Sequence, residues 1–346
     1  MSAAVQVGVF ASGLLLGAGG ATLFAQRRTH APPAVGTSSP TPATPTRASW
    51  TAPAPAPEAA PKPATPAAHA PTSDALMLSG MPGPVADFLT HAAYVTSYDR
   101  RLRHAHWTAE HLTAESIRRP PGAEGINRAQ SIFSEDARVP VPFRSNNADY
   151  FRSGYDRGHL VPAADAKQSQ EAMNETFLLS NIAPQVGEGF NRDYWAHTED
   201  FVRRLTGQFR DLYVFTVPLY LPRQTSDGKW RVSYEVIGSP PNVSVPTHFA
   251  KVILGVGLTA SPRRDAMALG AFVLPNSRIP NEAPLRSFET DIEAVERAAG
   301  LSLFPAAIKK ASKKLCDTVK CEIIVRDFSN KAKAVMNDPK VLPSRS

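Results

Sequence analysis

Apolar and polar positions divide the chain into an apolar start, a Pro-rich stretch and a long region of alternating patterns. Residues 1–26 contain no Lys, Arg, Asp or Glu, and about 22 of them form a nearly uninterrupted apolar or small-residue run, long enough to cross a bilayer as a helix. Arg27 and Arg28 end this run. We expect residues 1–28 to be a membrane anchor or targeting segment. A cleaved secretory signal is the alternative, but such a signal usually has a basic start and a shorter apolar core.

Pro, Ala, Thr and Ser dominate residues 29–75, and this composition cannot bury a core. Its prolines favour an extended, semi-rigid tether. Regular patterns begin near residue 76, so we expect one globular domain over residues 76–330 and a short tail over residues 331–346.

Five segments of this domain are rich in β-branched and aromatic residues and are bounded by Gly, Pro or Asn, which is typical of strands. They are residues 212–222, 230–238, 247–258, 267–275 and 321–328. Residues 225–229, TSDGK, have the composition of a hairpin loop between the first two segments.

One clear helix is predicted within residues 190–209, because residues that suit a core recur there at the spacing of a single buried face. They are Tyr194, Trp195, Thr198, Phe201, Val202 and Leu205. Asn191 occupies the position of its N-cap. A second helix is predicted within residues 287–300, with Gly300 as its stop signal. Strands without regular helical alternation indicate an α+β fold on a mainly antiparallel sheet.

The chain is basic, with 38 Lys and Arg against 31 Asp and Glu and a formal net charge of +7. This balance suits a polyanionic partner such as nucleic acid or anionic lipid, although it identifies none. Cys316 and Cys321 are too few for a disulfide scaffold. Their spacing would permit one bridge in an oxidising compartment, but we expect two ordinary thiols, and zinc lacks further ligands nearby.

The sequence DRGH, residues 156–159, offers a carboxylate, a guanidinium and an imidazole within four positions, yet alone it fits a charged turn equally well. Asn181, in a SNIAPQ stretch, and Asn191 follow it, and Glu199 lies two turns into the predicted helix. The amide oxygen of Asn191 suits a hard ion such as Mg²⁺, which prefers oxygen ligands and keeps several waters. These residues therefore form a candidate hydrolytic site.

In such a site His159, neutral near pH 7, would take a proton from the attacking water. A cation held by Asn191 would stabilise the developing negative charge and the departing 3′ oxygen of a phosphodiester. Arg157 would hold the phosphate, and Glu199 would orient metal-bound water.

Four further histidines invite comparison with metal sites. His104 and His106, in HAHW, stand two residues apart, but alternate positions exposed on one face of a strand are the commoner case. We also expect structural roles for His197 and His248.

DRGH, SNIAPQ and FNRDYWAHTE together resemble the ββα-metal, DNA/RNA non-specific endonucleases, and the resemblance to their mitochondrial endonuclease G group is close. It extends through FRSNNADYFRSGYDRGH, YEVIGSPPNVSVPTHFAK and AFVLPN and so covers most of residues 76–330. The closing KKLCDTVKCEIIVRDFSN looks like the fungal mitochondrial branch in particular.

By this resemblance His159 matches the general base and Asn191 the magnesium ligand, while Arg157, Asn181 and Glu199 match supporting positions. The resemblance implies a strand pair and a helix that cradle the metal on a mixed, mainly antiparallel sheet. It also implies Mg²⁺, which Mn²⁺ can replace, DNA and RNA as substrates, and a homodimer.

The resemblance implies a mitochondrial protein of the inner membrane or intermembrane space, which can relocate to the nucleus or cytosol on release. Two alternatives remain open from the sequence. One is a nucleic-acid-binding protein that keeps the nuclease fold without catalysis, because fold alone does not prove activity. The other is a secreted nuclease that uses residues 1–26 as a signal peptide.

Overall fold

The structure is a computed structural model that describes residues 86–123, 125–260 and 266–326. The expected anchor over residues 1–28 and the tether over residues 29–75 lie outside the described residues, as does the tail. Among the helices that the structure describes, none has both the length and the hydropathy needed to cross a membrane.

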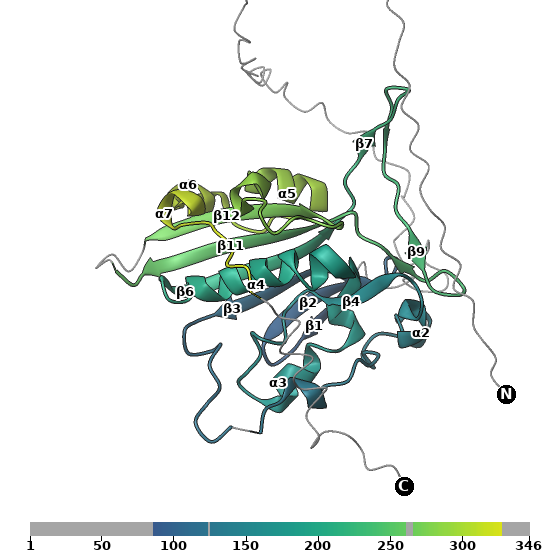
Figure 1. The fold of residues 1–346 in the computed structure, drawn as a ribbon, viewed down its shortest axis with the longest axis horizontal. Coiled ribbons are helices and arrows are strands. Elements are labelled where there is room, and N and C mark those ends of the chain that lie inside the picture. Colours follow the sequence, from purple (N-terminus) through teal and green to yellow (C-terminus); the bar gives the residue numbers. More distant parts are fainter. Residues whose placement is uncertain (1–85, 124, 261–265, 327–346) are drawn as a thin grey trace, which may run out of the picture. The chain divides into compact units, whose positions relative to one another are not determined.

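A mainly antiparallel sheet forms the centre of the described chain (Figure 1). Its strands, in spatial order, are β1 (Asp87–Thr90), β2 (Tyr94–Asp99), β3 (His104–Leu112), β6 (Phe209–Leu219), β11 (His248–Leu258), β12 (Met267–Pro275) and β13 (Glu289–Thr290). The short β14 (Lys313–Lys314) pairs with β12 in parallel, which makes the sheet mixed. The α+β fold with a mainly antiparallel sheet is therefore confirmed.

Helices cover the two faces of this sheet (Figure 1). The helix α4 (Tyr194–Leu205) buries all six residues of its predicted face against side chains of β6 and β11 such as Val214 and Phe249. The helix α5 (Ile292–Ala299) packs on the opposite face and ends, as predicted, at Gly300, which has the left-handed conformation. Both helices follow the periodicity of their apolar residues because each buries one face.

The candidate site is built beside α4 from a separate antiparallel strand pair, β4 (Tyr155–His159) and β5 (Ile182–Val186). The irregular turn η4 (Gly187–Asn191) joins β5 to α4. The sequence around DRGH thus forms one strand of a pair, and the pair leads directly into the helix that carries Glu199.

The remaining elements are short. The helices and helical turns are η1 (Arg128–Gln130), η2 (Val141–Phe143), α2 (Asn147–Tyr150), α3 (Gln170–Glu175), η3 (Leu179–Asn181), η5 (Leu285–Phe288), α6 (Ala306–Ala311) and α7 (Leu315–Thr318). The strands are β7 (Arg223–Gln224), β8 (Trp230–Arg231), β9 (Val236–Ile237) and β10 (Val243–Ser244), and the predicted TSDGK loop joins β7 to β8.

Two predicted strands are wrong or only partly formed. Residues 321–326 form no strand: the carbonyl of Glu322 accepts a hydrogen bond from Arg204 (2.7 Å), and Arg326 pairs with Asp200 (3.3 Å). This segment therefore crosses α4 instead of joining the sheet. The segment over residues 230–238 contributes only the two short strands β8 and β9.

The expectation of free thiols is also wrong, because Cys316 and Cys321 form a disulfide with a Cα–Cα distance of 5.2 Å. Both side chains are buried in the core that includes Leu315 and Val319. The start of α7 and the segment after it bring the two sulfur atoms together, which sequence spacing alone did not determine. The bridge therefore fastens the segment that crosses α4.

Candidate active site

The DRGH sequence forms β4, and His159 at its end pairs in register with Ile182 of β5. Gly158 is required by the packing of this pair: a Cβ atom there would lie 2.2 Å from the side-chain Cδ of Gln185. Gln185 is fully buried, and its Nε2 lies 3.5 Å from the carbonyl oxygen of His159. The glycine thus lets an amide side chain approach the backbone behind the imidazole.

The imidazole of His159 is almost enclosed, with 8% of the residue exposed. Its ring centroid lies 4.7 Å from that of Phe177 and 5.4 Å from that of Phe133. The Nε2 atom is buried and has no hydrogen-bond partner among the described residues. Burial, together with the positive charge of Arg128, lowers the pKa of His159 to about 3. The ring is therefore neutral near pH 7, with an unpartnered nitrogen.

Two arginines flank this imidazole. Arg157 is exposed, donates to Asn147 Oδ1 (2.7 Å) and stacks 4.6 Å above the centroid of Phe133. Arg128, from η1, lies 5.3 Å from the centroid of Phe177, which is the ring that touches His159. The site therefore presents positive charge beside a neutral imidazole, which favours an anionic ligand such as a phosphate.

The sequence predicted Asn191 as the N-cap of α4, and this prediction is wrong. Asn191 is the last residue of the turn η4. Asp193 occupies the position before the first residue of α4, and the amide of Asn191 instead donates to Asp156 Oδ2 (2.9 Å). Gly189 has a φ of 79°, which lets the turn bend between β5 and Asn191. The prediction failed because the turn η4 extends to Asn191, and the side chain of Asn191 contacts β4 instead of capping α4.

The carboxylate of Asp156 is the acceptor that orients this amide. Burial alone would raise the pKa of Asp156, but hydrogen bonds from Arg192 and Asn191 lower it. Arg192 Nε donates to the same Oδ2 at 2.7 Å. Because Nδ2 faces Asp156, the carbonyl oxygen of the Asn191 side chain faces away from it.

These residues fit a hard divalent cation. No described residue donates a hydrogen bond to Asn191 Oδ1, and the residue is partly exposed, so a neutral oxygen is open to a ligand. A Mg²⁺ ion is often held by one or two protein oxygens, several waters and substrate phosphates. The described residues contain no cluster of three His, Cys, Asp or Glu that could hold a metal ion by themselves. The chemistry of the donor set thus suits an ion shared with substrate rather than a closed protein cage.

Glu199 lies on α4 two turns after Asn191 and is partly buried. Burial raises the pKa of Glu199 to about 7, and the positive charges of Lys251 and Arg203 oppose this rise. Arg203 follows one helical turn later and pairs with the buried carboxylate of Asp165 (2.9 Å). The charge of Arg128 acts on both Glu199 and His159, which connects the helix to the end of β4.

Asn181 lies in the same region but has a different environment from the other predicted site residues. It is fully buried, and its Oδ1 accepts from the Val161 amide (3.0 Å). Its Nδ2 donates to the carbonyls of Val161 (2.9 Å) and Thr176 (2.8 Å). The side chain thus contacts backbone just after His159.

The other histidines lie in structural environments. His104 is fully buried against the hydroxyl of Tyr220 (2.6 Å), so its expected exposure is wrong, because β3 is covered at this end. His106 Nε2 lies 2.8 Å from the carbonyl of Ala299. His248 contacts the Thr247 hydroxyl (3.0 Å), and His197 is buried in α4.

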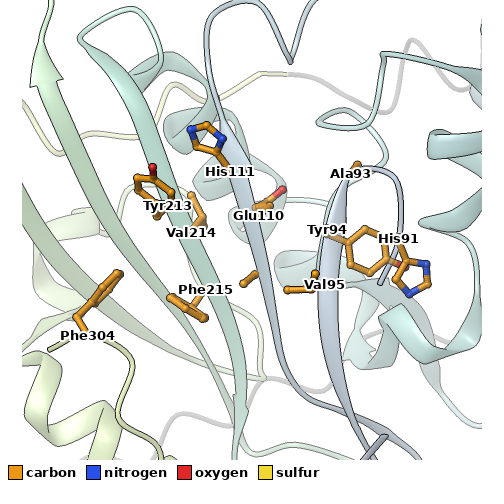
Figure 2. Close-up of a pocket in the computed structure, with 11 residues that line it drawn as sticks. His91, Ala93, Tyr94, Val95, Glu110, His111, Tyr213, Val214, Phe215 and Phe304 are labelled. Atoms are coloured by element: carbon orange, nitrogen blue, oxygen red, sulfur yellow. The ribbon is translucent and has the colours of Figure 1, made fainter. Parts of the chain in front are cut away.

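An apolar groove of about 370 Å³ lies away from this chemistry, beside β2, β3 and β6 (Figure 2). His111, Tyr213, Phe215 and Phe304 are among its lining residues. Tyr213 and Phe215 alternate along β6 with Leu212 and Val214, which face α4. Phe215 and Phe304 pack together in the cluster that includes Ile292 and Val295 of α5, so the groove is not part of the candidate active site.

Sequence reasoning missed Arg128 and Arg203 as members of this charged cluster. Arg203 had a usable signal, because it stands four residues after Glu199 on a predicted helix and so shares its face. Arg128 had none, since it lies 31 residues before His159 in an irregular region and only the fold brings it near.

Comparisons with known proteins agree with this fold. The family model described as DNA/RNA non-specific endonuclease matches residues 72–309. The mitochondrial nuclease of Saccharomyces cerevisiae is 50% identical over 265 residues, which cover 76% of this chain and 79% of that protein. Human mitochondrial endonuclease G is 42% identical over 232 residues, 67% of this chain and 74% of that protein.

A solved structure is similar over most of the described region. It is a crystal structure of the EndoG/EndoGI complex, whose subject is the mechanism of EndoG inhibition. The matched chain is 44% identical, with a TM-score of 0.62, and the match covers 70% of this chain and 94% of that one.

Proposed function

Since the chain belongs to the DNA/RNA non-specific endonuclease family, we propose that it is a Mg²⁺-dependent enzyme that hydrolyses the phosphodiester bonds of DNA and RNA. The observation that carries this proposal is the neutral imidazole of His159, whose buried Nε2 lacks a hydrogen-bond partner among the described residues. The exposed Arg157 lies on the same strand, and Asp156 of that strand orients the amide of Asn191.

His159 acts as the general base in this proposal. Its Nε2 takes the proton from the attacking water, and the low pKa keeps this nitrogen free to accept it. A bound phosphate brings negative charge beside the ring, which raises the pKa of the imidazole toward the range in which a base works well. The aromatic walls formed by Phe133 and Phe177 fix the plane of the ring.

Asn191 would hold the metal through its Oδ1, because Asp156 accepts a hydrogen bond from its Nδ2. When bound, Mg²⁺, or Mn²⁺ in its place, supplies positive charge that stabilises the transition state and the departing 3′ oxygen. Arg157 would hold the phosphate with the guanidinium donors that Asn147 leaves open, and Glu199 would orient metal-bound water. Asn181 supports the site by holding the backbone after His159.

The substrates follow from what this surface contacts. Arginines and a metal ion recognise phosphate, which every DNA and RNA strand carries, whereas sequence is read at base edges. The net charge of +7 favours association with such polyanions. We therefore propose cleavage of both nucleic acids with little sequence preference.

The names of the relatives support a mitochondrial location. In this proposal residues 1–28 anchor the enzyme to the inner membrane or direct it to the intermembrane space, and residues 29–75 tether the catalytic domain. Release of the enzyme from the membrane would permit its transfer to the nucleus or cytosol. The enzyme works as a homodimer. Protease protection in isolated mitochondria, compared with recovery from the culture medium, separates this location from secretion.

The test is cleavage of plasmid DNA and of RNA by the purified chain with Mg²⁺ and with EDTA. The His159→Ala variant is expected to lose about 10²- to 10⁴-fold in rate, which is the usual contribution of general acid–base catalysis. His106→Ala, a change outside the site, serves as the matched control and keeps its rate. Salt-dependent binding without cleavage at any metal concentration would instead favour a noncatalytic nucleic-acid-binding protein.

A further inference from the structure

Lys251 is a charged residue at the centre of the sheet, on β11, and only 1% of it is exposed. Its Nζ donates to Thr216 Oγ1 on the neighbouring strand β6 at 2.6 Å. It also donates to the main-chain carbonyl of Leu160 at 3.1 Å. Leu160 directly follows His159, so a buried ammonium group holds the backbone beside the proposed base.

Hydrogen bonds to Asn181 also fix the turn after His159. The Leu160 amide donates to the carbonyl of Asn181 (3.0 Å), and the Val161 amide donates to Asn181 Oδ1 (3.0 Å). The carbonyl of Val161 accepts from Asn181 Nδ2 (2.9 Å). Lys251 of the sheet donates to the carbonyl of Leu160, and Asn181 binds the backbone of Val161. Two separate side chains therefore fix this turn.

An ion pair does not account for the ammonium group. The nearest described carboxylate oxygen in an ion pair with Lys251 is Glu110 Oε1, at 3.9 Å, beyond hydrogen-bonding distance. Burial raises the pKa of Glu110 well above its usual value, which favours its neutral form near pH 7. The charge of Lys251 also opposes the raised pKa of Glu199, so the ammonium belongs to a buried group of charges and not to one close ion pair.

The same ammonium also reaches α4. Its Nζ lies 5.2 Å from the ring centroid of Trp195, which is 1% exposed and stands in the first turn of α4. A cation over an indole ring is attracted to it. One charge in the sheet therefore contacts both pieces of the site, the turn after His159 and the start of the helix that follows Asn191.

We propose that Lys251 is a positioning residue for His159: its ammonium fixes the turn that begins at Leu160 and links this turn to the start of α4. The inference rests on the proposed role of His159 as the base. Lys251 is almost fully buried, so it acts on the position of the imidazole through the backbone of Leu160 and not by contact with substrate or metal.

The test compares Lys251→Met with Thr216→Val as a matched control. Both remove a hydrogen bond of the ammonium, but only the first removes the contact to Leu160. Lys251→Met is expected to lower kcat by about 10- to 100-fold, the size of effect expected when a reacting group is displaced by about 1 Å. The KM for plasmid DNA is expected to stay within about twofold, because the phosphate contacts are unchanged. Thr216→Val is expected to lose thermal stability and keep its kcat.

A signal that does not depend on catalysis completes the test. The ring signal of His159 in ¹³C–¹H spectra, assigned by its loss in His159→Asn, is expected to shift in Lys251→Met and to stay in place in Thr216→Val. This spectrum separates the present inference from the proposed function, which is tested by cleavage and by the activity of His159→Ala.

An unshifted His159 signal and an unchanged kcat in folded Lys251→Met would overturn the proposal. So would an equal loss of kcat in Thr216→Val. If Lys251→Met does not fold, Lys251→Gln is used, since its shorter amide can still donate to Thr216. Failure of both variants to fold would also overturn the proposal, because Lys251 would then be required by the sheet itself.

Discussion

At the scale of single residues, the environment of His159 disfavours the charged imidazole in two ways. Its aromatic neighbours Phe133 and Phe177 exclude solvent and so disfavour the charged ring, while Arg128 adds a repelling charge. The protein thus holds an imidazole that binds a proton weakly until an anion arrives. A phosphate beside the ring offsets these effects, because an opposite charge favours the protonated imidazole.

The lowered pKa of His159 predicts a pH-dependent contribution to stability. The folded pKa is about 3, below the ordinary value of 6.5, so between these values the unfolded chain binds more protons than the folded one. Stability is therefore lost as the pH falls below about 6.5. His159→Asn removes this contribution, and its stability relative to wild type is expected to improve by about 2 kcal/mol between pH 7.5 and pH 5.

Urea unfolding of both proteins at the two pH values measures this difference. Other buried histidines act equally in both proteins and cancel in the comparison. A difference in unfolding free energy that does not change with pH would mean that His159 has an ordinary pKa in the folded protein.

At the scale of elements, three consecutive pieces of chain build the site: the pair β4–β5, the turn η4 and the helix α4. Asp156 connects the first to the second, since its carboxylate receives both Asn191 and Arg192. Lys251 connects the first to the third. The geometry of the proposed metal ligand therefore depends on a residue of the strand that carries the base.

Replacing Asp156 tests this dependence. In Asp156→Ala the amide of Asn191 loses the acceptor that orients it, so the Mg²⁺ concentration for half-maximal cleavage is expected to rise by about 10- to 100-fold, as is usual when a partner of a metal ligand is lost. Titration of plasmid cleavage with Mg²⁺ measures the change. Arg192→Ala is the control, because it leaves the contact between Asp156 and Asn191 in place. An unchanged requirement in Asp156→Ala would remove Asp156 from this role.

Elements with one buried face were predictable because burial imposes a period on the sequence. The six residues of the predicted face of α4 show this, since all of them are buried. The long strands β6, β11 and β12 were predictable instead from their β-branched and aromatic composition. Residues 321–326 have the composition of a strand but lie across α4, held by Arg204 and by the Cys316–Cys321 bridge. Local composition reports a residue's suitability for a sheet and not which surface the segment meets.

At the scale of the whole molecule, the sequence predicted the family and the candidate residues but not how they are supported. Arg157 and His159 share β4, and Asp156 joins Asn191 to that strand, whereas Arg128 and Lys251 contact this region from distant positions in the chain. Such contributions depend on contacts between distant segments. Motif spacing carries no record of them, which is why a buried lysine in a strand gave no sign of its contact to Leu160.

The central claim is that His159 and Asn191 serve one reaction as base and metal ligand. The most direct measurement is kcat/KM for plasmid cleavage at a fixed Mg²⁺ concentration in wild type, His159→Ala, Asn191→Ala and the double variant. Each single change is expected to lower the rate by at least about 10²-fold. The double variant is expected to lose far less than the product of the two, because residues that act as a unit are strongly non-additive. Wild-type activity in either single variant, or losses that multiply in full, would contradict the account.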